Sequence, residues 1–198
     1  MKNLILSLIL ILFTHSGFAN TGQDGGSIEF GVNFGGDTIA YNPGGDDYKA
    51  GGGGLLLVGY YWPDELLENT SYQISTGVRY QGAKIGKGEN MGWITKVAMS
   101  HALMDYDLIN NGSLKNYDVS VGVGFQIDLF SYTKNEFGVK TNINDSISPY
   151  IFAEWEIGPL VSFTASYLIT EFTDENDVVY KGNQFGLGLR MTGLNFIP

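Results

Sequence analysis

The chain has 198 residues, a formal net charge of −10, no cysteine and only 16% charged residues. The lack of cysteine excludes disulfides, cysteine-ligated zinc, thiol nucleophiles and a lipid-modified cysteine, and the acidic balance argues against nucleic-acid binding, which needs a basic surface. Glycine is abundant, at 28 residues, and aromatic residues make up 14%. This composition is typical of membrane-spanning β-strands with small residues on one face and aromatic girdles at the membrane interfaces.

The first 19 residues have the pattern of a secretory signal peptide. Lys2 supplies the positive charge, Leu4 to Phe13 the apolar stretch, and Gly17 to Ala19 a small-x-small cleavage site. The apolar stretch is too short to cross the roughly 30 Å of hydrocarbon in a bilayer as a helix. We therefore expect cleavage after Ala19, export, and one mature domain over residues 20–198. No later stretch is long and apolar enough for a transmembrane helix, so a membrane crossing would have to use strands in a closed barrel.

Alternation of apolar and polar residues predicts β-strands along the mature chain. In the clearest case, Tyr117 to Leu129, every odd-numbered residue is apolar or aromatic and every even-numbered one is small, polar or acidic. This period of two fits a strand and no helix. Comparable segments predict eight strands, at about residues 27–38, 52–62, 71–83, 92–108, 115–131, 147–158, 160–173 and 181–196.

Two places break the alternation. In the fourth predicted strand, Lys96 lies on one parity of the polar positions and Asp105 on the other. A β-bulge, one extra residue that switches the parity, would reconcile the two halves if it lay between about Ala98 and Leu103. In the last strand, Phe196 has the opposite parity from the apolar residues before it, which leaves the exact end of that strand open.

The connections between predicted strands alternate in length. Those after the first, third, fifth and seventh strands are polar and mostly long, at residues 35–51, 82–90, 131–146 and 173–183. Those after the second, fourth and sixth strands are shorter, at residues 63–71, 109–115 and 158–159. In outer-membrane barrels the long loops face outward and the short turns face the periplasm. We therefore expect four polar to acidic external loops and both termini in the periplasm.

The composition of the polar face favours a membrane barrel over a soluble one. A soluble barrel of the lipocalin type is apolar inside and polar outside, whereas a membrane barrel is the reverse. The polar face here consists mainly of Gly, Ser, Thr, Asn and Gln with few charges, which suits a narrow lumen better than a solvent-exposed surface. The predicted fold is therefore an all-β, eight-stranded antiparallel up-and-down transmembrane β-barrel.

The mature chain resembles the small Gram-negative outer-membrane β-barrel proteins, a porin-like group that includes OmpX and the transmembrane domain of OmpA. The most suggestive pieces are Ser148 to Trp155, the turn at Gly158 and Pro159, and the closing QFGLGLRMTGLNF. The resemblance implies an outer-membrane location, contact with outer-membrane lipid and lipopolysaccharide, insertion by the outer-membrane machinery, no cofactor and a monomer. Members of the group usually end on an aromatic residue, whereas here Ile197 and Pro198 follow Phe196.

The charged residues of the polar face form the candidate site. The interior of an eight-stranded barrel is only wide enough to be filled by side chains, so we interpret these residues as an ion-pair network that plugs the lumen. They are Glu29, Arg79, Lys96, Asp118, Asp128, Glu154, Glu156 and Arg190. The alternative is an ion path, or a catalytic pair of Glu154 and Glu156 about 6.6 Å apart along one strand.

The leading functional hypothesis is a non-enzymatic surface scaffold that displays four loops for envelope integrity or adhesion. A narrow pore for small solutes is one alternative. Another is a lipid A-modifying hydrolase centred on His101, because similar barrels use a His with a Ser and an acid. Ser100 adjoins His101, but neighbours in a strand point to opposite faces. Acidic residues that cluster in the predicted loops could offer oxygen ligands to Ca²⁺. They are Asp46, Asp47, Asp174, Glu175 and Asp177. Their spacing is not that of an EF-hand, so we expect no metal site.

Overall fold

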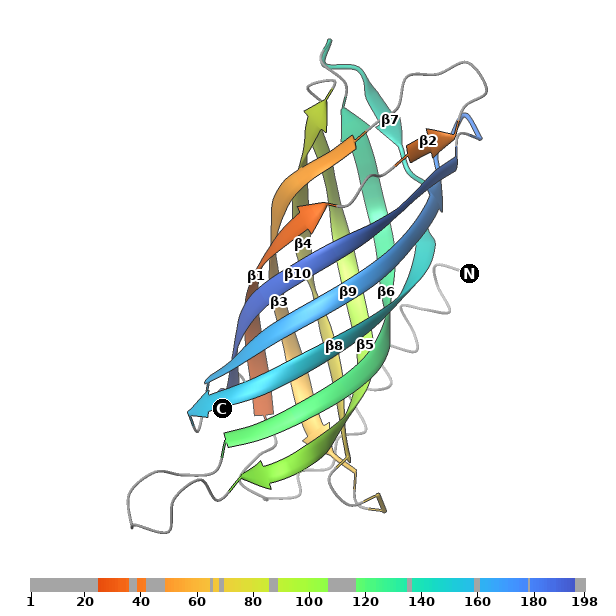
Figure 1. Cartoon of the computed structure of the whole chain (residues 1–198). Coiled ribbons are helices and arrows are strands. Elements are labelled where there is room, and N and C mark those ends of the chain that lie inside the picture. Colours follow the sequence, from red (N-terminus) through yellow and green to blue (C-terminus); the bar gives the residue numbers. More distant parts are fainter. Residues whose placement is uncertain are drawn as a thin grey trace.

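A computed structural model describes most of the chain beyond residue 24, as one closed antiparallel sheet (Figure 1). The described residues are 25–35, 39–41, 49–64, 66–67, 70–85, 89–106, 117–134, 137–158, 161–177 and 179–194. The wall strands are β1 (Gly25–Gly35), β3 (Lys49–Pro63), β4 (Thr70–Ile85), β5 (Glu89–Tyr106), β6 (Tyr117–Lys134), β8 (Ser146–Gly158), β9 (Val161–Thr173) and β10 (Val179–Leu194). The predicted signal peptide, residues 1–19, lies outside the described residues.

The wall closes because β1 pairs with both β3 and β10. All other neighbours in the wall follow one another along the chain and are antiparallel. Two short strands pair with wall strands at one end of the barrel. β2 (Ile39–Tyr41) pairs with β10, and β7 (Lys140–Asn142) pairs with β6. The predicted closed, eight-stranded antiparallel barrel is therefore confirmed. Among the described residues no helix is long and apolar enough to cross a membrane.

The two faces of the wall have opposite chemistry. In β6, Val123 and Phe125 are more than half exposed on the outside, whereas Gln126 and Asp128 are buried in the lumen. The same alternation runs through β9. The barrel is thus polar inside and apolar outside, the arrangement expected in lipid. The exposed apolar residues include Phe30, Val32, Phe34, Leu56, Val58, Val78, Trp93, Val97, Met99, Ile151, Trp155, Ile169, Phe185 and Leu189.

A bulge in β5 produces the predicted change of parity. The β5–β6 register shifts between Ala102 and Met104, so Leu103 is the extra residue, at the end of the predicted interval. A second bulge lies at the other end of the same pair, where Phe130 and Ser131 of β6 face Gly92 of β5. Phe130 has a positive φ of 52°. Gly92 is required there because a Cβ atom would clash with the Ser131 hydroxyl.

A bulge near the end of β10 accounts for the parity break close to the C-terminus. Met191 pairs with Ile28 and Leu194 with Gly26, so residues 192–193 face the single residue Ser27 of β1. Leu194 therefore falls on the same face as Met191, although the two differ in parity. Phe196 itself lies outside the described residues.

The lengths of the connections differ from those predicted. We refer to the end where β1 begins and β10 ends as the terminal end, and to the other as the loop end. The predicted long loop at residues 82–90 is wrong, because β4 continues to Ile85 and β5 begins at Glu89. Likewise, β9 and β10 are joined at the loop end by residues 174–178 alone. Strands can extend beyond a membrane with polar residues on both faces, and such extensions lose the alternation that marks a strand.

The turn after β3, at the terminal end, is organised by one carboxylate. Asp64 Oδ1 accepts hydrogen bonds from the backbone N–H groups of Leu66 and Leu67, at 2.7 and 3.1 Å. Its Oδ2 accepts one from the Tyr72 hydroxyl at 2.6 Å. These bonds favour the ionised form and lower the pKa of the Asp64 carboxyl, with the Tyr72 bond as the largest cause.

Candidate functional site

The lumen holds most of the charged residues that the sequence singled out. Six of them are between 2% and 8% exposed: Glu29, Arg79, Lys96, Asp128, Glu154 and Arg190. They come from β1, β4, β5, β6, β8 and β10, so nearly every part of the wall contributes one. Glu156 is half-buried near the terminal end of β8. Asp118 belongs to β6, but its side chain lies outside the described part of the structure.

Each of the three cations among these six residues has a carboxylate partner. Lys96 Nζ lies 3.0 Å from Glu29 Oε1 and joins β5 to β1 across the lumen. Arg79 Nη2 lies 2.8 Å from Asp128 Oδ1. Arg190 pairs with Glu154. Burying a single ion costs several kcal/mol, and a well-placed partner offsets much of that cost.

Neutral polar groups extend the pair formed by Arg190 and Glu154. Arg190 also donates to the Gln73 side chain, and the Ser162 hydroxyl donates to Glu154 Oε1. The Arg190 guanidinium lies over the Tyr61 ring, with 5.4 Å between Cζ and the ring centroid. One connected group of side chains therefore lies in the terminal half of the lumen.

A similar group surrounds Asp128 nearer the loop end. Gln126 Nε2 donates to Asp128 Oδ2 at 3.1 Å, and Arg79 Nη2 lies 3.5 Å from Asn90 Oδ1. Across the lumen, Gln184 Nε2 donates to Gln81 Oε1 at 3.1 Å. The sequence identified the charges of this group, but not the glutamines and the asparagine that lie beside them.

An apolar layer lies between the two polar groups. Tyr150, Phe152 and Leu168 are buried together with Ala98. Gly122 is required opposite this layer, because a Cβ atom there would clash with the Phe152 ring. A void of about 10 Å³ beside Lys96, Gln126 and Tyr150 is the space that one water needs.

His101 lies on the outer wall, away from the lumen. Its ring is exposed, whereas Ser100 is buried on the opposite face, as predicted for neighbours in a strand. The Nδ1 atom of His101 lies 3.1 Å from the Thr70 hydroxyl. Ser100 and His101 therefore do not form a nucleophile–base pair.

The acidic residues of the described loops make protein contacts. Glu175 Oε2 accepts a hydrogen bond from Asn142 Nδ2 at 2.9 Å, and Asp174 Oδ1 accepts one from the backbone of Asn176 at 2.8 Å. Asp46 and Asp47 lie outside the described residues. Within the part of the chain that the structure describes, no group of three or more His, Cys, Asp or Glu side chains is placed to hold a metal ion.

Comparison with solved structures identifies known proteins with a similar fold. No protein-family model and no curated protein sequence matches the chain. Neisserial surface protein A is similar in structure, with a TM-score of 0.56 at 10% identity over 86% of this chain and 99% of that one. Ail of Yersinia pestis (14% identity, 86% and 99% covered, TM-score 0.45) and OprG of Pseudomonas aeruginosa (10%, 86% and 96%, 0.45) are more distant. The chain thus has the fold of small outer-membrane β-barrel proteins, as the resemblance in its sequence predicted.

Proposed function

We propose that the chain is a non-enzymatic outer-membrane scaffold, a barrel whose lumen is closed by its own side chains and whose loops are displayed at the cell surface. The observation that carries this proposal is the set of three buried ion pairs in the lumen. Each pair joins strands that are not neighbours in the wall, and the pair of Lys96 and Glu29 crosses the lumen. A filled interior stiffens a barrel and opposes solute flow. What remains for interaction is the loop end, for envelope integrity or adhesion.

The orientation follows from the chain's ends and connections. With a cleaved signal peptide before residue 20, the terminal end would face the periplasm, where the tight connection at residues 159–160 also lies. The loop end, with β2 and β7, would face outward. The outer wall supports a membrane location, because its exposed side chains are largely apolar and would be costly in water.

The pore alternative is less well supported. A pore would need a continuous polar path, whereas Lys96 and Glu29 meet across the lumen and the void beside them measures about 10 Å³. The apolar layer of Tyr150 and Phe152 adds a second obstruction at the same level.

The hydrolase alternative also has little support. His101 is hydrogen-bonded to Thr70, the first residue of β4 after a terminal-end turn. In the proposed orientation His101 faces the periplasmic leaflet, while lipopolysaccharide occupies the outer one. The hydroxyl that meets the imidazole belongs to Thr70 and not to Ser100, the predicted partner, which points into the lumen.

Fractionation of the cell envelope tests this proposal. We expect the chain in the outer membrane, with gel mobility that changes on boiling, and with loops that surface-applied protease cleaves in intact cells. Recovery from the soluble periplasm without a heat-dependent shift would refute the barrel scaffold. Protease cleavage only after the outer membrane is broken would refute the orientation.

A further inference from the structure

Outward side chains on one side of the barrel form a raised row across six strands. Each member pairs directly with the next, from β4 through β5, β6, β8 and β9 to β10. All are large and apolar or aromatic, and we call this row the ridge: Tyr72, Met99, Val123, Ile151, Tyr167 and Phe185.

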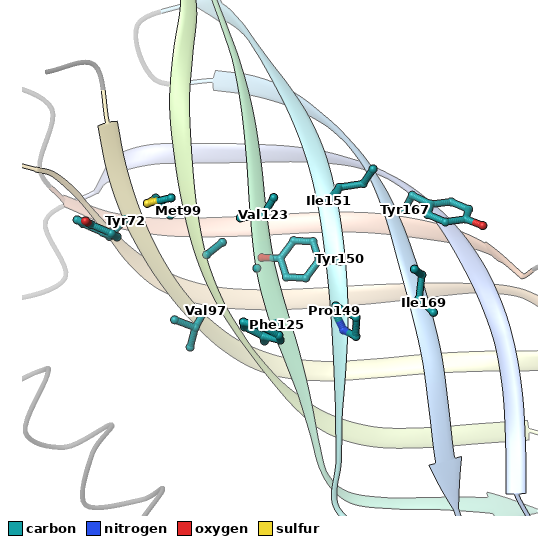
Figure 2. A pocket seen from close by; sticks show the side chains of 12 residues that line it. Tyr72, Val97, Met99, Val123, Phe125, Pro149, Tyr150, Ile151, Tyr167 and Ile169 are labelled. Atoms are coloured by element: carbon teal, nitrogen blue, oxygen red, sulfur yellow. The ribbon is translucent and has the colours of Figure 1, made fainter. Parts of the chain in front are cut away.

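A groove runs along each side of the ridge. The groove toward the loop end has a volume of about 560 Å³ and is bordered by Val97, Phe125, Pro149 and Ile169. Figure 2 shows these side chains with the ridge residues of strands β4 to β9, which are Tyr72, Met99, Val123, Ile151 and Tyr167. The groove toward the terminal end, which we call the terminal groove, has a volume of about 540 Å³. Its lining differs, because it includes His101.

The floor of the terminal groove is made by two alanines. Ala153 of β8 pairs directly with Ala165 of β9. On one side of them stands the ridge pair of Ile151 and Tyr167, and on the other the pair of Trp155 and Phe163. Outward side chains on these strands therefore alternate large, small, large, and this alternation produces a trough in the wall.

His101 lies in the same row as the two alanines, next to the residue at its end. The row runs Thr70, His101, Val121, Ala153, Ala165, each paired with the next. The Thr70 hydroxyl bonds to Nδ1 of His101 and fixes the ring, which leaves Nε2 available on an exposed side chain. A polar ring thus marks the terminal end of a groove whose other members are almost all apolar.

We propose that the terminal groove binds one acyl chain of a phospholipid of the periplasmic leaflet, with the lipid phosphate at Nε2 of His101. An acyl chain is a narrow, flexible, apolar rod that can enter an open trough sideways from the bilayer. A histidine N–H is a good donor to a phosphate oxygen. The position of His101 toward the terminal end selects the periplasmic leaflet. A second barrel is a poorer occupant, because its convex wall would rest on the ridge and leave the trough empty.

Photo-crosslinking tests this binding site in the intact protein. The full chain is reconstituted in phosphatidylethanolamine vesicles that contain some phosphatidylethanolamine with a diazirine on its acyl chain. Irradiation followed by peptide mass spectrometry is expected to label Val121, Ala153 and Ala165, which line the terminal groove alone, above the outward residues of β1 and β3. Uniform labelling of the wall, or crosslinks between two barrels at the alanine row, would overturn the proposal.

Two variants separate the acyl site from the phosphate site. Ala165→Phe fills the trough and should reduce labelling of Val121 and Ala153, which line the terminal groove but not the other one, about tenfold. Val32→Phe, which adds a ring on β1, should leave this labelling unchanged. His101→Ala should weaken labelling by the phospholipid about tenfold, a loss of about 1.4 kcal/mol, but not labelling by a diazirine diacylglycerol without phosphate. Equal labelling of wild type and both groove variants would refute the site.

Separate controls test whether each variant folds and whether the scaffold proposal holds. Heat-dependent gel mobility verifies that each variant forms the barrel, and Ala153→Leu replaces Ala165→Phe if the latter does not fold. The inference requires a barrel in lipid but not a closed lumen. A conducting lumen would therefore refute the scaffold while leaving the labelling pattern of the groove intact.

Discussion

Replacement of Lys96 by methionine is the sharpest test of the lumen network. Lys96 and Glu29 are 6% and 8% exposed, and 3.0 Å separates Nζ from Oε1. Methionine keeps most of the volume but leaves Glu29 without this partner. Breaking one side of a buried pair costs about 3–5 kcal/mol, and Arg190, paired with Glu29 across the β1–β10 ladder, favours the lower end of that range. The double variant Lys96→Met/Glu29→Gln removes the uncompensated charge and should recover most of the loss.

The assay is reversible urea unfolding of the barrel in lipid vesicles, analysed as a double-mutant cycle. Lys134→Met provides a matched control, because Lys134 Nζ lies 3.1 Å from Glu89 Oε1 but the two side chains are 40% and 35% exposed. We expect this control to cost less than about 1 kcal/mol. The reasoning would be refuted if Lys96→Met cost no more than the control, or if the double variant lost the sum of the single losses.

Three further perturbations follow from particular contacts. Gly122→Val should destabilise the barrel by about 1–3 kcal/mol through overpacking against Phe152, and an unchanged urea midpoint would contradict this packing. Asp177→Gly should stabilise the loop end by up to about 1 kcal/mol, because Asp177 has a φ of 62°; a lower midpoint would count against it. The pKa of the Asp64 carboxyl is lower in the folded chain than its ordinary value, which it has in the unfolded chain. The carboxylate therefore stabilises the fold at pH values above the unfolded-state pKa. This stabilisation is lost as the pH falls through the lower folded-state pKa. Tyr72→Phe should raise the Asp64 pKa in an NMR titration, and an unchanged pKa would show that the Tyr72 bond has no such effect.

The strands and their faces could be predicted because lipid imposes a strict rule on the wall. Outward residues such as Val123 and Phe125 must be apolar, and the inward positions between them must be small or polar, so the period of two is visible in one sequence. The bulge near Leu103 was predictable for the same reason, since it switches the parity of the polar positions. The loop-end extensions of β4 and β5 were not, because residues 82–90 do not alternate regularly between polar and apolar side chains.

The pairing of the charges could not be predicted from the sequence. Whether Lys96 meets Glu29, 67 residues away, depends on the register of three strand pairs and on the tilt of the strands in the wall.

The trough formed by Ala153 and Ala165, by contrast, could have been predicted from the sequence. The two-residue connection at 159–160 constrains the register of β8 and β9 strongly, which places Ala153 opposite Ala165 once the bulge at Ile157 is allowed for.

The closed lumen is tested most directly by the electrical conductance of the purified full chain in planar lipid bilayers. A lumen filled by the pairs of Lys96, Arg79 and Arg190 with their carboxylates predicts no steady single-channel current for the wild type. It also predicts no steady current for Arg79→Ala/Asp128→Ala, because the other two pairs and the apolar layer of Tyr150 and Phe152 remain in the lumen. A stable conductance step in the wild type, unchanged in the double variant, would contradict the account.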